Sequence, residues 1–200
     1  IGFKCDYLIN DLKIINNTFV SSDDCVDGYF DVKTTMYNNI FYSINGGYIF
    51  DLSYNVSTFI PELNNNAYYT SGEFAYVDWP FYFSADSLED WQTKSKMDYN
   101  SFTLVDPKFK DAYMDLHACS DSLIGNGKYF EFVKSDIDGE TRTVNNPSIG
   151  ADIFQIMDNN FLGDSLSFCE GSSIKIDAGI GTDYLWSTSE QTRSIDVITP

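Results

Sequence analysis

One short pattern recurs through the first third of the chain: two asparagines, one variable residue and an aromatic residue. It occurs at Asn16–Phe19, Asn38–Phe41 and Asn65–Tyr68, with spacings of 22 and 27 residues. Such spacings are typical of one turn of a solenoid built from short strands and tight bends. Stacked turns would let the asparagines exchange amide hydrogen bonds and would stack the rings in the interior. The sequence therefore predicts a polar ladder of Asn16, Asn17, Asn38, Asn39, Asn65 and Asn66 and an aromatic ladder of Phe19, Phe41 and Tyr68. The alternative is chance recurrence of Asn-rich turns in an Asn-rich chain.

The composition favours strands over helices. Aromatic residues make up 16% of the chain, and short runs of Ile, Val, Tyr and Phe alternate with clusters of Asn, Asp, Gly and Ser. This alternation is typical of strands joined by turns. One segment, Ser87–Gln92, instead predicts a short helix, because a hydroxyl precedes an acidic first turn and two apolar residues share one face. We expect an all-β fold with one short helix.

The charge balance excludes several classes of partner. The chain has 30 acidic and 12 basic residues, a net charge of -18, so it lacks the clustered cations that nucleic-acid binding requires. Anionic membrane surfaces would repel it for the same reason. No apolar run approaches the roughly 18 residues of a membrane span. We expect a secreted or cell-surface protein, and we expect the 200 residues, which begin at Ile1 without an initiator Met, to be a fragment of a longer chain.

An ordered set of motifs resembles a known family. It comprises the Asn-Asn-x-aromatic turns, Asn66–Tyr69, Leu88–Gln92, Asn100-Ser101, Asp106–Phe109, Asp136–Arg142 and Ile149–Asp152. In this order the motifs resemble the C-terminal turns of bacterial right-handed parallel β-helix proteins of the pectate-lyase-like superfamily. The resemblance implies that residues 1–157 are terminal rungs and cap of a parallel β-helix, with the last two motifs closing the solenoid.

The remaining segment, residues 158–200, has a different pattern. Alternation of apolar residues is clear at Ile174/Ile176 and Ile195/Val197, separated by Gly-rich turns. The segment resembles the first half of an immunoglobulin-like sandwich, of the kind that precedes the sorting domain of type IX secretion cargo proteins. This resemblance makes Trp186 the core tryptophan of the partial sandwich.

The four cysteines disfavour zinc. Cys5, Cys25, Cys119 and Cys169 contain no C-x-x-C pair, and His117 is the single histidine. Cys5 and Cys25 are about one solenoid turn apart, so a disulfide between them would suit an exported protein. The alternative is two buried free thiols, because stacked positions need not meet the Cα spacing of a disulfide.

No catalytic residue is predicted for this segment. Ser22–Cys25 resembles the Gly-Asp-Asp-Cys motif of polygalacturonases, in which paired Asp residues activate water and protonate the leaving oxygen. The partner motifs Gly-His-Gly and Arg-x-Lys are absent from the sequence, so we interpret Asp23 and Asp24 as an acidic loop between rungs. His117 has no catalytic partner nearby in sequence and is interpreted as structural.

The acidic motif Asp136-x-Asp138-Gly139-Glu140 resembles half of an EF-hand loop. It lacks the later ligands that complete the calcium cage, so a tight turn is the preferred interpretation. Asp136, Asp138 and Glu140 are the weak metal candidates, calcium is the only cofactor considered, and otherwise no cofactor is expected.

Two functions fit this sequence. The first is a non-catalytic segment of a large secreted bacterial surface protein, a stalk or adhesin that binds polysaccharide and reaches the secretion and attachment machinery through a C-terminal region outside these residues. The second is the C-terminal part of a β-helix polysaccharide lyase or glycoside hydrolase whose catalytic rungs precede Ile1. Missing catalytic motifs favour the first.

Overall fold

The chain forms two compact units, Ile1–Phe154 and Gln155–Pro200. The computed structural model describes residues 2–5, 11–28, 34–52, 62–78, 82–104, 106–118, 120–153, 173–178 and 183–198. The boundary predicted between residues 157 and 158 lies outside these ranges, so it stays a prediction.

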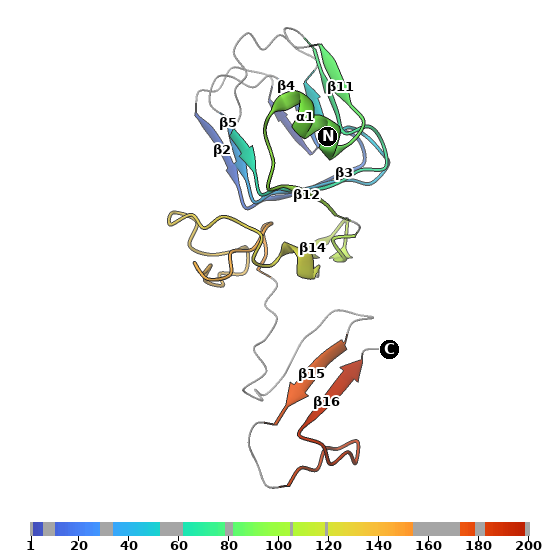
Figure 1. Ribbon diagram of the computed structural model, residues 1–200, viewed down its shortest axis with the longest axis vertical. Coiled ribbons are helices and arrows are strands. Elements are labelled where there is room, and N and C mark those ends of the chain that lie inside the picture. Colours follow the sequence, from blue (N-terminus) through green and yellow to red (C-terminus); the bar gives the residue numbers. More distant parts are fainter. Residues whose placement is uncertain are drawn as a thin grey trace. The chain divides into compact units, whose positions relative to one another are not determined.

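The first unit is a parallel β-helix, and the predicted all-β class is confirmed. Its strands form three stacked sheets that enclose a triangular interior (Figure 1). Sheet A contains β1 (Phe3–Cys5), β4 (Val26–Gly28), β7 (Phe50–Leu52), β10 (Ala75–Val77) and, antiparallel at its edge, β11 (Phe83–Ala85). Sheet B contains β2 (Leu12–Ile15), β5 (Thr34–Tyr37) and β8 (Glu62–Asn64). Sheet C contains β3 (Thr18–Ser21), β6 (Ile40–Ser43), β9 (Ala67–Tyr69) and β12 (Phe102–Thr103).

The first asparagine of each pair makes the bend between sheets B and C. Asn16, Asn38 and Asn65 have φ values of 56°, 57° and 54°. Most residues adopt this left-handed conformation only at a cost in energy. Asparagine tolerates it, because its short side-chain amide can form hydrogen bonds with the nearby backbone. The positive φ at this bend therefore explains why the first residue of each pair is an asparagine.

The second asparagine of each pair joins successive rungs. Asn39 Oδ1 accepts the backbone N–H of Asn17 at 2.9 Å, and Asn66 Oδ1 accepts that of Asn39 at 2.9 Å. The backbone N–H of Asn66 donates to Ser101 Oγ at 2.7 Å. Ser101 thus occupies the same ladder position on a fourth rung, where the pattern has Asn-Ser in place of Asn-Asn.

The interior is filled by in-register apolar side chains. The rings of Phe19, Phe41 and Tyr68 stack at centroid distances of 5.2 Å and 5.6 Å. Opposite them, the parallel register aligns Ile14 with Met36 and Met36 with Leu63. Each buried chain contributes on the order of 1.5–3 kcal/mol, so these columns supply the main stabilisation of the solenoid.

The bend that leads into sheet A requires glycine. A Cβ added at Gly72 would overlap the carbonyl oxygen of Gly46, and one added at Gly47 would overlap the backbone of Asp23. The backbones of successive rungs therefore lie so close together at this bend that no side chain fits between them.

Helix α1 (Leu88–Ser95) lies across the last rung (Figure 1). Ser87 is its N-cap and accepts the Asp90 N–H at 3.2 Å, which confirms the predicted capped helix. Trp91 is 1% exposed and stacks on Phe50 with the ring centroids 5.1 Å apart. The helix thereby covers the end of the apolar interior.

Residues 106–118 and 120–153, named here the outer layer, pack on the outside of sheet C. They contain β13 (Phe109–Asp111), β14 (Asp115–Ala118) and a 3₁₀ turn at Asp121–Leu123. A second apolar core joins the layer to the sheet and consists of Ile40, Ala67, Leu104, Ala118, Leu123 and Ile149. The two motifs expected to close the solenoid therefore cover one of its sides, and α1 occupies the end instead.

The first asparagines also anchor the outer layer. Asn16 Nδ2 donates to the Ser148 carbonyl at 3.0 Å, and Asn38 Nδ2 donates to the Lys128 carbonyl at 2.6 Å. Asn65 Nδ2 donates to the Asn126 carbonyl at 3.0 Å. One column of bends thus shapes the solenoid and attaches the layer.

Cys25 is a buried free thiol, so the suggested disulfide between Cys5 and Cys25 is not formed. The parallel register explains this, because Cys5 pairs with Gly28, three residues beyond Cys25. Three strand residues advance the chain by roughly 10 Å, which exceeds the Cα separation that a disulfide spans. Cys119 and Cys169 lie outside the described residues.

The described part of the second unit is a two-stranded antiparallel sheet, β15 (Ser173–Asp177) paired with β16 (Ser194–Ile198). Trp186 lies in the connection between these strands, is half-buried, and donates its indole N–H to the Thr192 carbonyl at 2.7 Å. Trp186 therefore lies outside the two described strands of this unit, and its role as the core tryptophan of an immunoglobulin-like sandwich stays a prediction. Among the described residues, no helix is long and apolar enough to cross a membrane.

Candidate functional site

A cluster of ionisable side chains lies in the outer layer and involves the single histidine of the chain. Asp115 and His117 come from one face of β14, because they are two residues apart in a strand. Asp138 comes from a tight turn, and Asp152 is the last residue of the motif Ile149–Asp152. We call these four residues the outer-layer cluster.

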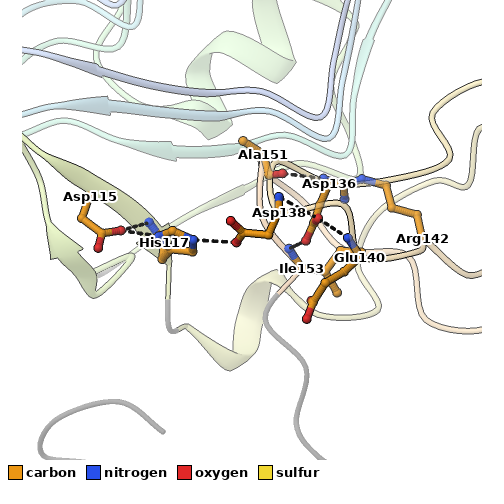
Figure 2. Close-up of polar contacts among 8 residues, drawn as sticks. All are labelled: Asp115, His117, Asp136, Asp138, Glu140, Arg142, Ala151 and Ile153. Atoms are coloured by element: carbon orange, nitrogen blue, oxygen red, sulfur yellow. Dashed lines mark hydrogen bonds and ion pairs between the residues drawn. The ribbon is translucent and has the colours of Figure 1, made fainter. Parts of the chain in front are cut away.

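The imidazole of His117 lies between two carboxylates (Figure 2). Its Nδ1 contacts Asp115 Oδ1, and its Nε2 lies 2.7 Å from Asp138 Oδ2. The hydrogen bonds with Asp115 and Asp138 raise the pKa of His117 to about 9. At neutral pH the imidazole is therefore a cation held by two anions.

Asp152 is the third carboxylate near the imidazole. One donor atom from each of His117, Asp138 and Asp152 falls within a group whose members all lie within 4.8 Å of one another. Burial raises the pKa of Asp152, and the nearby carboxylates, Asp136 and Asp138 among them, raise it further. Negative charge is thus crowded at this point in the layer.

The turn that presents Asp138 is built on Asp136. Asp136 Oδ1 accepts the backbone N–H groups of Asp138 at 3.0 Å and Glu140 at 2.7 Å, and its Oδ2 accepts that of Ile153 at 3.1 Å (Figure 2). Asp136 therefore acts as the hydrogen-bond centre of the turn, as an aspartate does in an Asx-turn. The preferred interpretation of this motif as a tight turn agrees with that geometry.

Arg142 ties the same turn to the segment before Asp152. Its side chain is 8% exposed, and its Nη2 donates to the carbonyl groups of Gly150 at 2.8 Å and Ala151 at 2.9 Å. Its Nη1 donates to Ser148 Oγ at 3.0 Å. The two Nη groups are thus committed to backbone and hydroxyl oxygens, which fixes the chain that carries Asp152, whereas the buried Nε has no hydrogen-bond partner among the described residues.

The weak metal candidates of the sequence separate in the structure. Only Asp138 belongs to the outer-layer cluster: the Asp136 oxygens accept backbone N–H groups, and Glu140 is not part of the group of donor atoms that lie within 4.8 Å of one another. Sequence reasoning missed His117 and Asp152 as partners of Asp138. The one usable signal was the alternation of Asp115 and His117, which places both on one strand face.

A second polar group is buried beneath α1. Asp98 is 2% exposed and accepts the Tyr68 hydroxyl at 2.6 Å and the Ser101 hydroxyl. Burial raises the pKa of Asp98, and these two hydroxyl groups oppose the rise. Asp98 has a φ of 69° and turns the chain from α1 into the fourth rung, so it serves the fold.

The Asp23-Asp24 motif lies at the bend into sheet A. Asp24 Oδ1 accepts the backbone N–H of Tyr48 at 2.8 Å, and the carbonyl of Asp23 accepts the Ser43 hydroxyl at 3.1 Å. Both residues therefore join neighbouring rungs. Comparison with protein-family models, with curated proteins and with solved structures gave no match for this chain.

Proposed function

We propose that this chain is a non-catalytic segment of a large secreted bacterial surface protein, a stalk or adhesin that binds polysaccharide and is exported by the type IX secretion system. The pectate-lyase-like ancestry and the immunoglobulin-like nature of the second unit belong to the same proposal. The observation that carries it is the structural use of Asp24, whose carboxylate accepts the Tyr48 backbone N–H at 2.8 Å and so joins two rungs.

The polar ladders support a stalk. Asn39 and Asn66 are fully buried and their side chains bond to neighbouring rungs, and the rings of Phe41 and Tyr68 stack beside them. Such a column extends by adding rungs, each of which contacts only its neighbours. A net charge of -18 keeps so repetitive a surface soluble outside the cell.

A row of side chains on the outer face of sheet A favours the polysaccharide-enzyme alternative. The register aligns Lys4 with Asp27, Asp27 with Asp51, and Asp51 with Tyr76. Two carboxylates on adjacent strands are the residue types that glycoside cleavage uses. Lys4 forms an ion pair with Asp27 at 3.6 Å, which gives Asp27 a structural partner.

An activity assay separates the two functions. Residues 1–200 are incubated with polygalacturonate, alginate and neutral plant polysaccharides, and reducing ends and unsaturated products are measured. We expect no release above that of an Asp51→Asn variant. Release that depends on Asp51 would refute the non-catalytic proposal and establish the enzyme alternative.

Location is tested in the organism that produces the protein. Antibodies against residues 1–153 should label intact cells, and external proteinase K should remove that label. Deleting the type IX translocon should retain the protein inside the cell. Labelling only after permeabilisation would contradict a surface location, whatever the activity assay shows.

A further inference from the structure

The outer-layer cluster has the donor set of a transition-metal site. One ring nitrogen of His117 and one carboxylate oxygen each from Asp138 and Asp152 all lie within 4.8 Å of one another, and Nε2 is the nitrogen that contacts Asp138. These three residues come from β14, from the turn built on Asp136, and from the end of the outer layer. One nitrogen and two oxygens from separate segments form the donor set.

The orientation of the imidazole within the cluster fits this donor set. His117 Nδ1 is engaged by Asp115, so Nε2 is the nitrogen directed at Asp138 (Figure 2). Metal-binding histidines commonly give their remaining N–H to a carboxylate, which fixes the ring orientation and makes the coordinating nitrogen more basic. Asp115 fills that role here and is not itself one of the three donors.

The local charge also favours a cation. Three carboxylates, Asp136, Asp138 and Glu140, act on Asp152 by repulsion, and the charge of His117 opposes them. Arg142 cannot enter the cluster, since its Nη groups donate to Ser148, Gly150 and Ala151. A bound dication would neutralise the crowded carboxylates without disturbing those bonds.

We propose that His117 Nε2, Asp138 and Asp152 bind one divalent transition-metal ion of the zinc class, and that this ion fastens β14 to the end of the outer layer. An imidazole ligand selects such ions over calcium and magnesium, which prefer an all-oxygen shell. On binding, the ion takes the Nε2 lone pair, and the Nε2 proton is released to solvent. Three protein ligands leave further positions for water.

The required movement is small. Two ligands about 2.0–2.1 Å from a tetrahedral zinc ion lie roughly 3.3 Å from each other. His117 Nε2 and Asp138 Oδ2 are now 2.7 Å apart, so they must separate slightly to admit the ion. The side chains of both are at least 40% exposed and have room to do so, 43% for His117 and 53% for Asp138.

The fold gives the ion a structural consequence. Ala118, next to His117, belongs to the second apolar core, and Gly150, two residues before Asp152, donates its N–H to the Asn38 carbonyl at 2.8 Å. A metal that joins His117 to Asp152 therefore joins two places at which the outer layer holds the β-helix. Zinc should raise the melting temperature of the outer layer as well as bind.

The single histidine makes the test direct. Residues 1–200 are titrated with ZnSO₄ in 100 mM NaCl, and the imidazole NMR signals and the heat of binding are recorded. We expect one zinc ion per chain, with the His117 Nε2 signal shifting as the ion binds. Calcium and magnesium at the same concentration should leave that signal in place.

Variants assign the ligands. His117→Gln should abolish the site, Asp138→Asn and Asp152→Asn should each weaken zinc binding at least tenfold, and Asp115→Asn should weaken it about tenfold or more. Asp86→Asn, an exposed aspartate before α1, is the matched control and should bind as the unchanged protein does. Circular dichroism establishes that each variant is folded, and the two Asp ligand variants decide the outcome where His117→Gln does not fold.

Three results would overturn the proposal. They are zinc binding of unchanged affinity in His117→Gln or in both Asp ligand variants, an unshifted His117 Nε2 signal at saturating zinc, and a calcium response equal to that of zinc. The last result would indicate diffuse cation binding to an acidic chain instead of a nitrogen-containing site.

Discussion

Replacing Asn39 by alanine tests whether the asparagine ladder stabilises the solenoid. Asn39 is 0% exposed, and its side chain makes three hydrogen bonds. Oδ1 accepts the Asn17 N–H at 2.9 Å, while Nδ2 donates to the Ile14 carbonyl at 2.8 Å and to Asn66 Oδ1 at 3.0 Å. Asn39→Ala removes all three bonds and leaves the buried Ile14 carbonyl without its donor.

The expected loss follows from these bonds. Two of the bonds contribute about 1 kcal/mol each, and the orphaned buried Ile14 acceptor costs about 1–3 kcal/mol in place of the third. The free energy of unfolding should therefore fall by about 3–5 kcal/mol. For a chain of this size the melting temperature should fall by roughly 6–20 °C.

Asn17→Ala is the matched control. Asn17 is the same residue type at the same ladder position, but it is exposed, and its Nδ2 bonds only to the nearby Ile15 carbonyl at 3.0 Å. This variant should lose about 0.5 kcal/mol or less. Unfolding is followed by far-ultraviolet circular dichroism in urea and on heating. Equal midpoints for Asn39→Ala and Asn17→Ala would refute the reasoning, because they would show that the buried ladder bonds contribute nothing.

Four further outcomes are expected. Asp98→Ala should lower the free energy of unfolding by about 2–4 kcal/mol because two buried hydroxyl groups lose their acceptor, whereas Asp98→Asn should cost less because it keeps one oxygen and tolerates a positive φ. Burial raises the pKa of Asp98 in the folded state above its pKa in the unfolded chain. As the pH falls through the folded-state pKa, the original chain should therefore gain stability relative to Asp98→Asn in urea titrations, and the gain should be complete below the unfolded-state pKa. A stability difference between the two proteins that stays the same from pH 7 to pH 3 would contradict this. Gly72→Ala should destabilise strongly or fail to fold, since its Cβ would overlap the Gly46 carbonyl, and melting temperatures equal to the original chain would disprove that contact. Ser87→Ala should cost about 1 kcal/mol by removing the cap of α1, which amide exchange of the Asp90 N–H reports, and unchanged exchange there would count against the cap.

The repeat was predictable because its cause is local. A parallel β-helix places equivalent residues of successive rungs over one another, so the same residue type recurs at the same bend of each rung. The sequence revealed the pattern at Asn38-Asn39 but not the separate roles of the two residues. The first Asn adopts a positive φ, and the second forms a hydrogen bond with the next rung. It also left Ser101 unassigned as the fourth member, because the intervening hairpin and α1 lengthen that turn to 35 residues.

Register decided what spacing alone left open. Cys5 and Cys25 are 20 residues apart, which sequence reasoning took as about one turn. The first two strands of sheet A are offset by 23 residues, because Phe3 pairs with Val26. The difference of three residues between 20 and 23 separates the two cysteines along the strand direction and excludes a disulfide between them.

By itself, the sequence determined the strand class, the stacked turns, the capped helix and the acidic surface, because each follows from interactions between residues that are near in sequence or repeated at a fixed interval. Only the tertiary structure decided that the motifs after residue 106 cover the side of sheet C and that His117, Asp138 and Asp152 meet. Those three residues lie 21 and 14 positions apart in irregular chain, where no period relates one to the next. Their meeting depends on how the outer layer is anchored to the column of asparagine bends, and that is a property of packing between distant segments.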